Sequence, residues 1–145
     1  MSEVSILLVE DDDVDVMAVA RALKTLKIAN PFFRAADGVE ALDMLRGTGG
    51  KTQLRALCII LLDLNMPRMN GLEFLDALRV DLKLRNSIVF VMTTSAAEED
   101  RVRAYNKCIA GYILKNNPAH TFLEAFTMLE YYWRVIEFPE QRAFA

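Results

Sequence analysis

The chain has 145 residues, of which 53% are hydrophobic and 26% charged, and its formal net charge is −3. This length and apolar content predict a single folded domain over residues 1–145 and exclude a disordered chain. Basic residues are scattered, the N-terminus lacks signal-peptide features, and no apolar stretch reaches the roughly 20 residues of a membrane span, so we expect a cytoplasmic protein that binds neither nucleic acid nor membrane.

Short apolar runs alternate with segments of helical periodicity along the chain. In order, the pattern predicts strand 4–9, helix 14–26, strand 32–35, helix 38–45, strand 58–62, helix 72–80, strand 88–92, helix 97–105, strand 111–114 and a helix from 118 to about 136. The polar stretch 46–57 is expected to be the most mobile loop. Such alternation implies a parallel sheet with helices on both faces, closed as a doubly wound α/β fold.

The helix 14–26 and the two cysteines allow more specific expectations. In the helix 14–26, the residues with helical apolar spacing are Val16, Val19, Ala20, Leu23 and Leu26. The two cysteines, Cys58 and Cys108, lie far apart and without metal-ligand spacing, so we interpret them as reduced core thiols.

Polar side chains follow four of the predicted strands. They are Glu10 to Asp13 after the first strand, Asp63 after the third, Thr93 to Ser95 after the fourth and Lys115 after the fifth. In open α/β sheets, ligands bind outside the carboxyl ends of the strands, so these groups could converge at one edge. Clustered carboxylates repel one another unless a cation joins them, and oxygen ligands suit Mg²⁺. A phosphoryl group on a carboxylate would satisfy both the metal ion and the lysine.

Each of these residues also has a purely structural interpretation. Asp12 or Asp13 could be a helix N-cap, Asp63 could be a turn residue, and Lys115 could be a solvated side chain. The combination at four strand ends rarely arises by accident, and it favours a functional site.

The segments ILLVEDDD, LLDLNMPRMNG, FVMTTS and GYILK occur in this order and resemble the receiver domain of bacterial response regulators, here of the single-domain, chemotaxis type. The resemblance extends from about residue 4 to residue 129, and LLDLNMPRMNG is its most specific part. It implies a flavodoxin-like fold with five strands in the order 2-1-3-4-5.

The resemblance also implies which residues form a phosphorylation site. Asp63 matches the phosphoacceptor, which takes its phosphoryl group from a sensor histidine kinase. Glu10 and Asp11 match the acidic pair that holds Mg²⁺ together with Asp63, and the backbone carbonyl of Asn65 would be a further ligand. The protein would then be a signalling protein and not an enzyme, with phosphotransfer and autodephosphorylation at Asp63 as its only chemistry.

The same resemblance assigns a switch. Thr93 matches the hydroxyl that turns toward the phosphoryl group, Lys115 matches its basic partner, and Tyr112 matches the aromatic residue whose rotamer follows. Thr94 is adjacent to Thr93, but the spacing to Tyr112 and Lys115 favours Thr93. The surface of the fourth helix, fifth strand and fifth helix would change with phosphorylation.

Several features depart from the family pattern or add to it. Lys115 is followed by Asn116, so the usual Lys-Pro peptide is absent. Pro67 and Gly71 look like residues that shape the loop after Asp63, with Gly supplying a positive φ and Pro a fixed one.

The last helix is unusually rich in apolar residues. One face carries Phe122, Phe126, Leu129, Trp133 and Ile136, and beside it lie Leu123, Tyr131, Tyr132 and Val135. This wide apolar arc favours a homodimer through the last helix and the extension 130–145, although the tail could instead fold back on its own domain. The aromatic helix and the acidic motifs are similar to regulators paired with phytochrome-type light sensors. With no output domain after the receiver, output through a protein contact or a histidine phosphotransfer protein is expected.

Other functions fit less well. A haloacid-dehalogenase phosphatase needs an acid at the position of Asn65, an EF-hand needs Gly and Glu where Val16 and Ala22 stand, and a P-loop needs Gly in place of Leu45. A pseudo-receiver that binds partners without phosphorylation remains the alternative.

Overall fold

The computed structural model describes residues 4–54 and 57–138. Five parallel strands form one sheet in the order β2-β1-β3-β4-β5, as expected. The strands are β1 (Ser5–Val9), β2 (Phe32–Ala35), β3 (Cys58–Leu62), β4 (Ile88–Thr93) and β5 (Gly111–Leu114). Each strand begins and ends within one residue of the segment that the sequence predicts, because continuous apolar runs bounded by polar residues are typical of strands buried on both faces.

Five helices connect and follow the strands. They are α1 (Asp13–Thr25), α2 (Gly38–Arg46), α3 (Gly71–Val80), α4 (Glu98–Asn106) and α5 (Pro118–Val135). Side-chain caps fix the start of three of them: Asp12 caps α1, Asp37 caps α2, and Asn70 forms a capping box with Glu73 at α3. These caps satisfy backbone N–H groups that have no partner within the helix.

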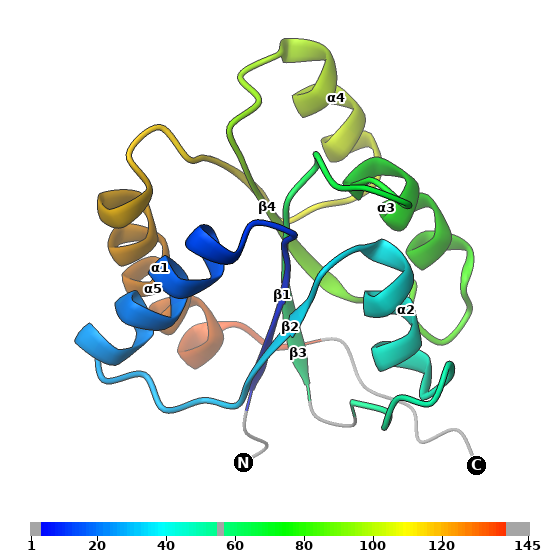
Figure 1. Cartoon of the computed structure of the whole chain (residues 1–145), viewed down its shortest axis with the longest axis horizontal. Helices are drawn as coiled ribbons and strands as arrows, with labels where there is room; N and C mark the ends of the chain where they lie inside the picture. The colour runs from blue at the N-terminus through cyan, green and yellow to red at the C-terminus, as the bar shows by residue number, and fades with distance from the viewer. Residues whose placement is uncertain (1–3, 55–56, 139–145) are drawn as a thin grey trace.

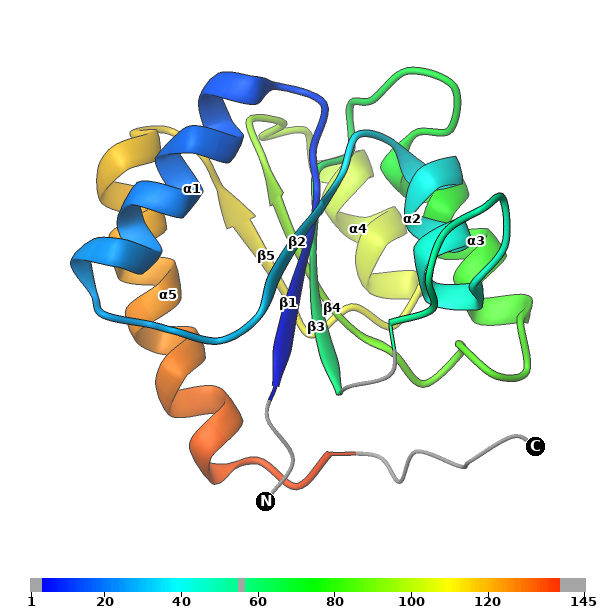
Figure 2. The ribbon, with the colours of Figure 1, turned by 60° about the horizontal axis from the view of Figure 1, so that its bottom comes forward.

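The helices cover both faces of the sheet. α1 and α5 lie side by side on one face, and α2, α3 and α4 cover the other (Figures 1 and 2). Successive strand residues point to opposite faces, so Leu7 and Val9 pack with α2 and α3, whereas Ile6 and Leu8 pack with α1 and α5. This doubly wound arrangement confirms the fold class.

One prediction about burial is wrong, and one position in the apolar spacing of α1 is not buried. Ala20 is exposed, and Ala22 occupies the buried stripe of α1 instead, because Ala22 lies three residues after the buried Val19 and so shares its face of the helix. Cys108 is exposed, in the turn between α4 and β5 with φ 62°, and is therefore not a core thiol. Cys58 fits the expectation better, since burial raises the pKa of its thiol to about 12.

The last helix uses more of its aromatic surface internally than the sequence suggests. Phe122, Phe126 and Leu129 are fully buried. Tyr132 packs edge-on against Phe90, with ring centroids 5.2 Å apart, although its position on the wider arc suggested a partner surface. Apolar side chains that stay largely exposed on the helix are Tyr131 and Val135, at 66% and 75%.

The first residues after α5 pack against their own domain. Phe138 lies edge-on to Tyr132, at 6.2 Å between ring centroids, and packs against the core on the α1–α5 face. The rest of the expected extension, residues 139–145, lies outside the described residues, and so do residues 55–56 of the polar loop before β3. The mobility of that loop stays a prediction. Among the described helices, none has the length and apolar character needed to cross a bilayer.

Candidate phosphoacceptor site

The carboxyl edge of the sheet gathers the side chains that the sequence places there. Glu10 follows β1, Asp63 follows β3, Thr93 ends β4 and Lys115 follows β5. All four are buried, with at most 7% of each residue exposed. Ionisable groups are rarely buried unless they are paired or hold a ligand, so this edge is the candidate functional site.

Three carboxylates form its acidic cluster. One oxygen from each of Glu10, Asp11 and Asp63 lies within 4.8 Å of the others. Asp63 Oδ1 is buried and has no hydrogen-bond partner among the described residues. An unpartnered buried carboxylate oxygen is costly, which indicates that the oxygen is meant for a ligand. An all-oxygen cluster of this kind fits a divalent cation such as Mg²⁺ or Mn²⁺.

Lys115, directly after β5, contacts this cluster. Its Nζ lies 2.7 Å from Glu10 Oε1, 2.8 Å from Asp15 Oδ2 and 3.9 Å from Asp63 Oδ2. The backbone N–H of Lys115 donates to the Thr93 carbonyl at 2.8 Å, which fixes the base of the side chain. The absence of proline after Lys115 therefore does not displace the ammonium group from the acids.

The charges in the cluster influence one another. Burial raises the pKa of Glu10, and the nearby Asp63 carboxylate adds to this, while the hydrogen bond from Lys115 opposes it. For Lys115, burial lowers the pKa, but hydrogen bonds to Asp15 and Glu10 outweigh burial and leave the pKa raised. The ammonium group thus stays charged among several carboxylates, where it can also meet an anionic ligand.

The expected switch residues are linked through the β4–α4 loop. Thr93 is completely buried and Thr94 is exposed, so the first of the two threonines is the one beside the site. Thr93 Oγ1 accepts a hydrogen bond from the Ser95 N–H at 3.3 Å, and the half-buried Tyr112 donates its hydroxyl to the Ser95 carbonyl at 2.8 Å. Movement of Thr93 would therefore disturb the hydrogen bonds of Ser95, including the one that it accepts from Tyr112.

Two residues of the site were missed at the level of sequence. Asp15, in the first turn of α1, is a direct partner of Lys115. Arg34 on β2 donates to the backbone carbonyls of Glu10 at 2.9 Å and Asp11 at 3.1 Å, which holds the loop that carries both acids. The spacing of Asp15, four residues after Asp11, could have suggested that it lies near the acidic pair. Nothing local in the sequence indicates the role of Arg34, because that role depends on the pairing of β2 with β1.

Gly71 shapes the loop after Asp63 for a different reason than expected. The glycines with positive φ among the described residues are Gly47, Gly49 and Gly50, and not Gly71. A Cβ at Gly71 would instead lie 2.5 Å from the Asp63 carbonyl oxygen and 2.7 Å from Leu64 Cα. Glycine is needed here because α3 starts in contact with the backbone of Asp63 and Leu64.

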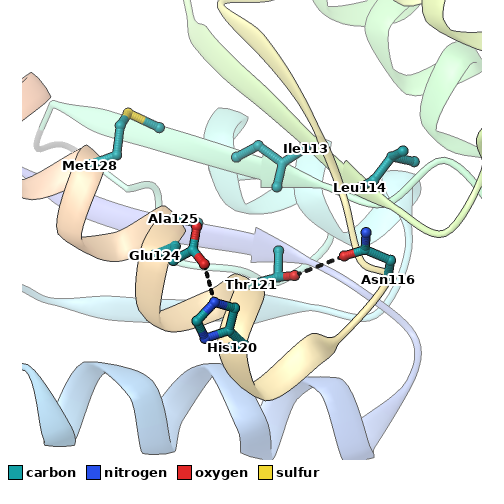
Figure 3. A pocket seen from close by; sticks show the side chains of 8 residues that line it. All are labelled: Ile113, Leu114, Asn116, His120, Thr121, Glu124, Ala125 and Met128. Atoms are coloured by element: carbon teal, nitrogen blue, oxygen red, sulfur yellow. Dashed lines mark hydrogen bonds and ion pairs between the residues drawn. The ribbon is translucent and has the colours of Figure 1, made fainter.

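A shallow groove lies close to the site but contains none of its acids. Its lining comes from β5 and α5 and consists of Ile113, Leu114, Asn116, His120, Thr121, Glu124, Ala125 and Met128 (Figure 3). His120 is paired with Glu124 across one turn of α5. Because Leu114 and Asn116 flank Lys115, the groove shares its backbone with the site.

Comparison with known proteins gives a consistent result. The family model described as the response regulator receiver domain matches residues 6–127. The chain is 33% identical over 130 residues to the probable methanogenesis regulatory protein FilR2 of Methanothrix harundinacea, covering 88% of this chain and 82% of that protein. It is 31% identical over 128 residues to the response regulator Rcp1 of Synechocystis, covering 88% of this chain and 87% of that protein.

Solved structures agree with this similarity. The Mn²⁺-bound form of Rcp1 superposes with a TM-score of 0.82 at 31% identity, covering 95% of this chain and 99% of that one. The phosphorylated cyanobacterial phytochrome response regulator RcpA gives 0.85 at 30% identity, covering 97% of this chain and 100% of that one. The bacteriophytochrome response regulator RtBRR gives 0.74 at 34% identity, covering 97% and 85%.

Proposed function

The chain belongs to the response regulator receiver domain family, which makes it a signalling protein of two-component phosphorelays, and we propose from this premise that Asp63 is its phosphoacceptor. The observation that carries this proposal is the environment of Asp63. Its buried carboxylate has one oxygen without a partner among the described residues, lies beside two other acids and is 3.9 Å from the Lys115 ammonium group.

Phosphotransfer at this site needs a nucleophile and a way to neutralise charge. A carboxylate oxygen of Asp63 attacks the phosphorus of a phosphohistidine on a sensor kinase, the P–N bond breaks, and an acyl phosphate forms on Asp63. Lys115 stabilises the negative charge on the phosphoryl oxygens, because its ammonium group is already buried and aimed at the cluster. Water later hydrolyses the acyl phosphate in the same site.

A divalent cation fits the acidic cluster. Glu10, Asp11 and Asp63 would hold it, with the backbone carbonyl of Asn65 as a further ligand, because these groups supply oxygen donors and Asp63 Oδ1 lacks a partner among the described residues. When bound, such a cation offsets the negative charge that the phosphoryl group brings to three carboxylates.

The signal leaves the site through the switch residues. Phosphorylation adds about 1.5 to 2 negative charges. Thr93 turns toward these charges, the hydrogen bond to Ser95 is lost, and Tyr112 is free to change its rotamer. The groove of β5 and α5 lies one residue from Lys115, so this surface and α4 would change together and present the output to a partner.

The partners follow from the family and from the surface of α5. The phosphoryl group comes from a sensor histidine kinase, and similarity to the phytochrome response regulator RcpA and the bacteriophytochrome response regulator RtBRR supports a kinase of the phytochrome type. A histidine phosphotransfer protein could accept the phosphoryl group onward. The exposed Tyr131 and Val135 on α5 support a homodimer through the last helix and the segment after it.

Phosphorylation of Asp63 can be tested directly. The protein is incubated with acetyl phosphate and Mg²⁺, and its intact mass is compared with that of Asp63→Asn and of Asp76→Asn, an exposed aspartate on α3. We expect the unsubstituted protein and Asp76→Asn to gain one phosphoryl group, and Asp63→Asn and the Mg²⁺-free sample to gain none. Modification that persists in Asp63→Asn would refute the assignment, and no modification by acetyl phosphate or by a cognate kinase would favour a pseudo-receiver.

A further inference from the structure

The loop from β3 to α3 carries Asn65, and an ion pair from its second half to the N-cap of α2 holds it in place. We infer that Arg68 and Asp37 form a positioning pair, which fixes this loop for cation binding and phosphorylation at Asp63. This inference rests on the proposed function, and its test below separates the two.

The contact between the two side chains is bidentate. Arg68 Nε donates to Asp37 Oδ2 at 2.7 Å, and Arg68 Nη2 donates to Asp37 Oδ1 at 3.1 Å. Asp37 is buried and also accepts from the Glu40 N–H at 2.9 Å as the N-cap of α2. Burial alone would raise the pKa of Asp37, but the hydrogen bonds from Arg68 and Glu40 hold it below its usual value. The carboxylate is thus a fixed, charged anchor.

The backbone of the loop takes a disfavoured shape at this contact. Arg68 has φ 60°, which is unusual for a residue with a side chain. The Met69 N–H donates to the Pro67 carbonyl at 2.7 Å across it, which closes a tight turn. A disfavoured conformation persists only where surrounding contacts hold it, and the ion pair to Asp37 is such a contact.

The next residue of the loop also rests on the start of α2. The Gly38 N–H donates to the Met69 carbonyl at 3.4 Å. A Cβ at Gly38 would lie 2.9 Å from Met69 Cγ and Sδ, so the methionine side chain lies directly on the helix start. The loop is therefore docked on α2 at two consecutive residues, Arg68 and Met69.

The docked residues limit the freedom of the segment that would supply the Asn65 carbonyl to the proposed cation site. On the strand side, the Asp63 N–H donates to the Val9 carbonyl at 3.0 Å, and the Leu64 carbonyl accepts from the Gly71 N–H at 2.9 Å. Asn65 is exposed and lies between these fixed points and Arg68. Without the ion pair, this segment would have to be ordered when the cation binds, at the expense of affinity.

The pair differs from a contact that only stabilises the fold. The Arg68 side chain is 62% exposed, and ion pairs with so much solvent contact add little to stability. Its loss should therefore weaken cation binding much more than it lowers the melting temperature.

The test compares two ion pairs on the same helix. Arg68→Gln and Asp37→Asn remove the charge on either side, and asparagine remains a good N-cap for α2. Arg46→Gln removes the matched ion pair at the other end of α2, which lies away from the acidic cluster. In that pair, the distance between Arg46 Nε and Asp81 Oδ2 is 3.0 Å. Mg²⁺ affinity is measured by calorimetry, phosphorylation by acetyl phosphate, and melting temperature without Mg²⁺.

We expect Arg68→Gln and Asp37→Asn each to weaken Mg²⁺ binding and slow phosphorylation by about tenfold, the lower end of the effect of losing an outer partner of a metal site. The double variant should be no worse than either single variant, and Arg46→Gln should bind as the unsubstituted protein does. Unchanged binding in both single variants, or additive losses in the double variant, would overturn the inference. If the unsubstituted protein neither bound Mg²⁺ nor became phosphorylated, the proposed function would fail, and this inference with it.

Discussion

At Gly71, the lack of a side chain decides where Asp63 lies. The start of α3 approaches the Asp63 carbonyl so closely that even a methyl group has no room. The atoms in the way belong to the backbone of Asp63 and Leu64, which cannot rotate aside as the end of a flexible side chain could.

We predict that Gly71→Ala moves the loop after β3. The substitution should lower the free energy of unfolding by about 1–3 kcal/mol, as overpacking typically does. Displacement of Asp63 should also slow its phosphorylation by acetyl phosphate. Urea denaturation and intact-mass kinetics measure the two effects.

Gly50→Ala is the control for this prediction. Gly50 has φ 79°, but a Cβ added there would meet no atom within 4 Å, so its substitution costs only the local backbone strain, about 1–2 kcal/mol. Phosphorylation should remain normal in this variant. A folded Gly71→Ala protein that is phosphorylated at the normal rate would contradict the role of close approach.

At the scale of elements, the start of α2 contributes a small, pH-dependent share of stability. Asp37 caps the helix and pairs with Arg68, while the neighbouring Glu40 accepts from the Ala36 N–H and pairs with Lys51. Among the groups around Asp37, the positive Arg68 makes the dominant contact, and so the pKa of Asp37 is lowered by folding.

This shift predicts how Asp37→Asn depends on pH. In the unfolded chain the aspartate titrates near its ordinary pKa of about 3.9, whereas in the folded protein it titrates lower. The contribution of the charged group is therefore complete above about pH 4 and is lost as the pH falls through the folded pKa. The difference in unfolding free energy between the unsubstituted protein and Asp37→Asn should be largest at pH 7 and should shrink below about pH 4, in urea titrations at each pH. A difference that stayed constant down to pH 3 would contradict the ion pair.

At the scale of the whole molecule, α5 has both an inner and an outer face. Phe122, Phe126 and Leu129 fill the core, and Tyr132 packs on Phe90. The outer face keeps exposed apolar residues, among them Tyr131. The helix therefore stabilises its own domain with its inner face, while its outer face keeps exposed apolar side chains that a second copy of the chain could contact.

We predict that Val135→Glu weakens self-association. Val135 is 75% exposed, so the glutamate is tolerated in the monomer but would be buried without a partner charge in a dimer through α5. Sedimentation velocity should show the unsubstituted protein as a dimer and Val135→Glu as a monomer at the same concentration. Val80→Glu, on α3 at 80% exposure, is the control and should remain dimeric. Monomeric unsubstituted protein at every concentration would exclude the dimer.

The sequence by itself determined the sheet, the helices and the edge where the acids meet. Periodicity placed each described element within one residue, because apolar runs and caps act locally. The residues after the strands, from Glu10 to Lys115, could be assigned to one edge, since parallel strands end together. The family motif then suggested which of them does what.

Only the tertiary structure decided how these groups are held. Three contacts join residues that are far apart in the chain. Lys115 pairs with Asp15, Arg34 holds the acidic loop, and Arg68 pairs with Asp37. Side-chain pairing of this kind has no periodic signal, because it arises where separate elements meet after the sheet has formed. The same reason explains why Gly71 looked like a turn glycine in the sequence but serves, in the fold, as a point of close contact.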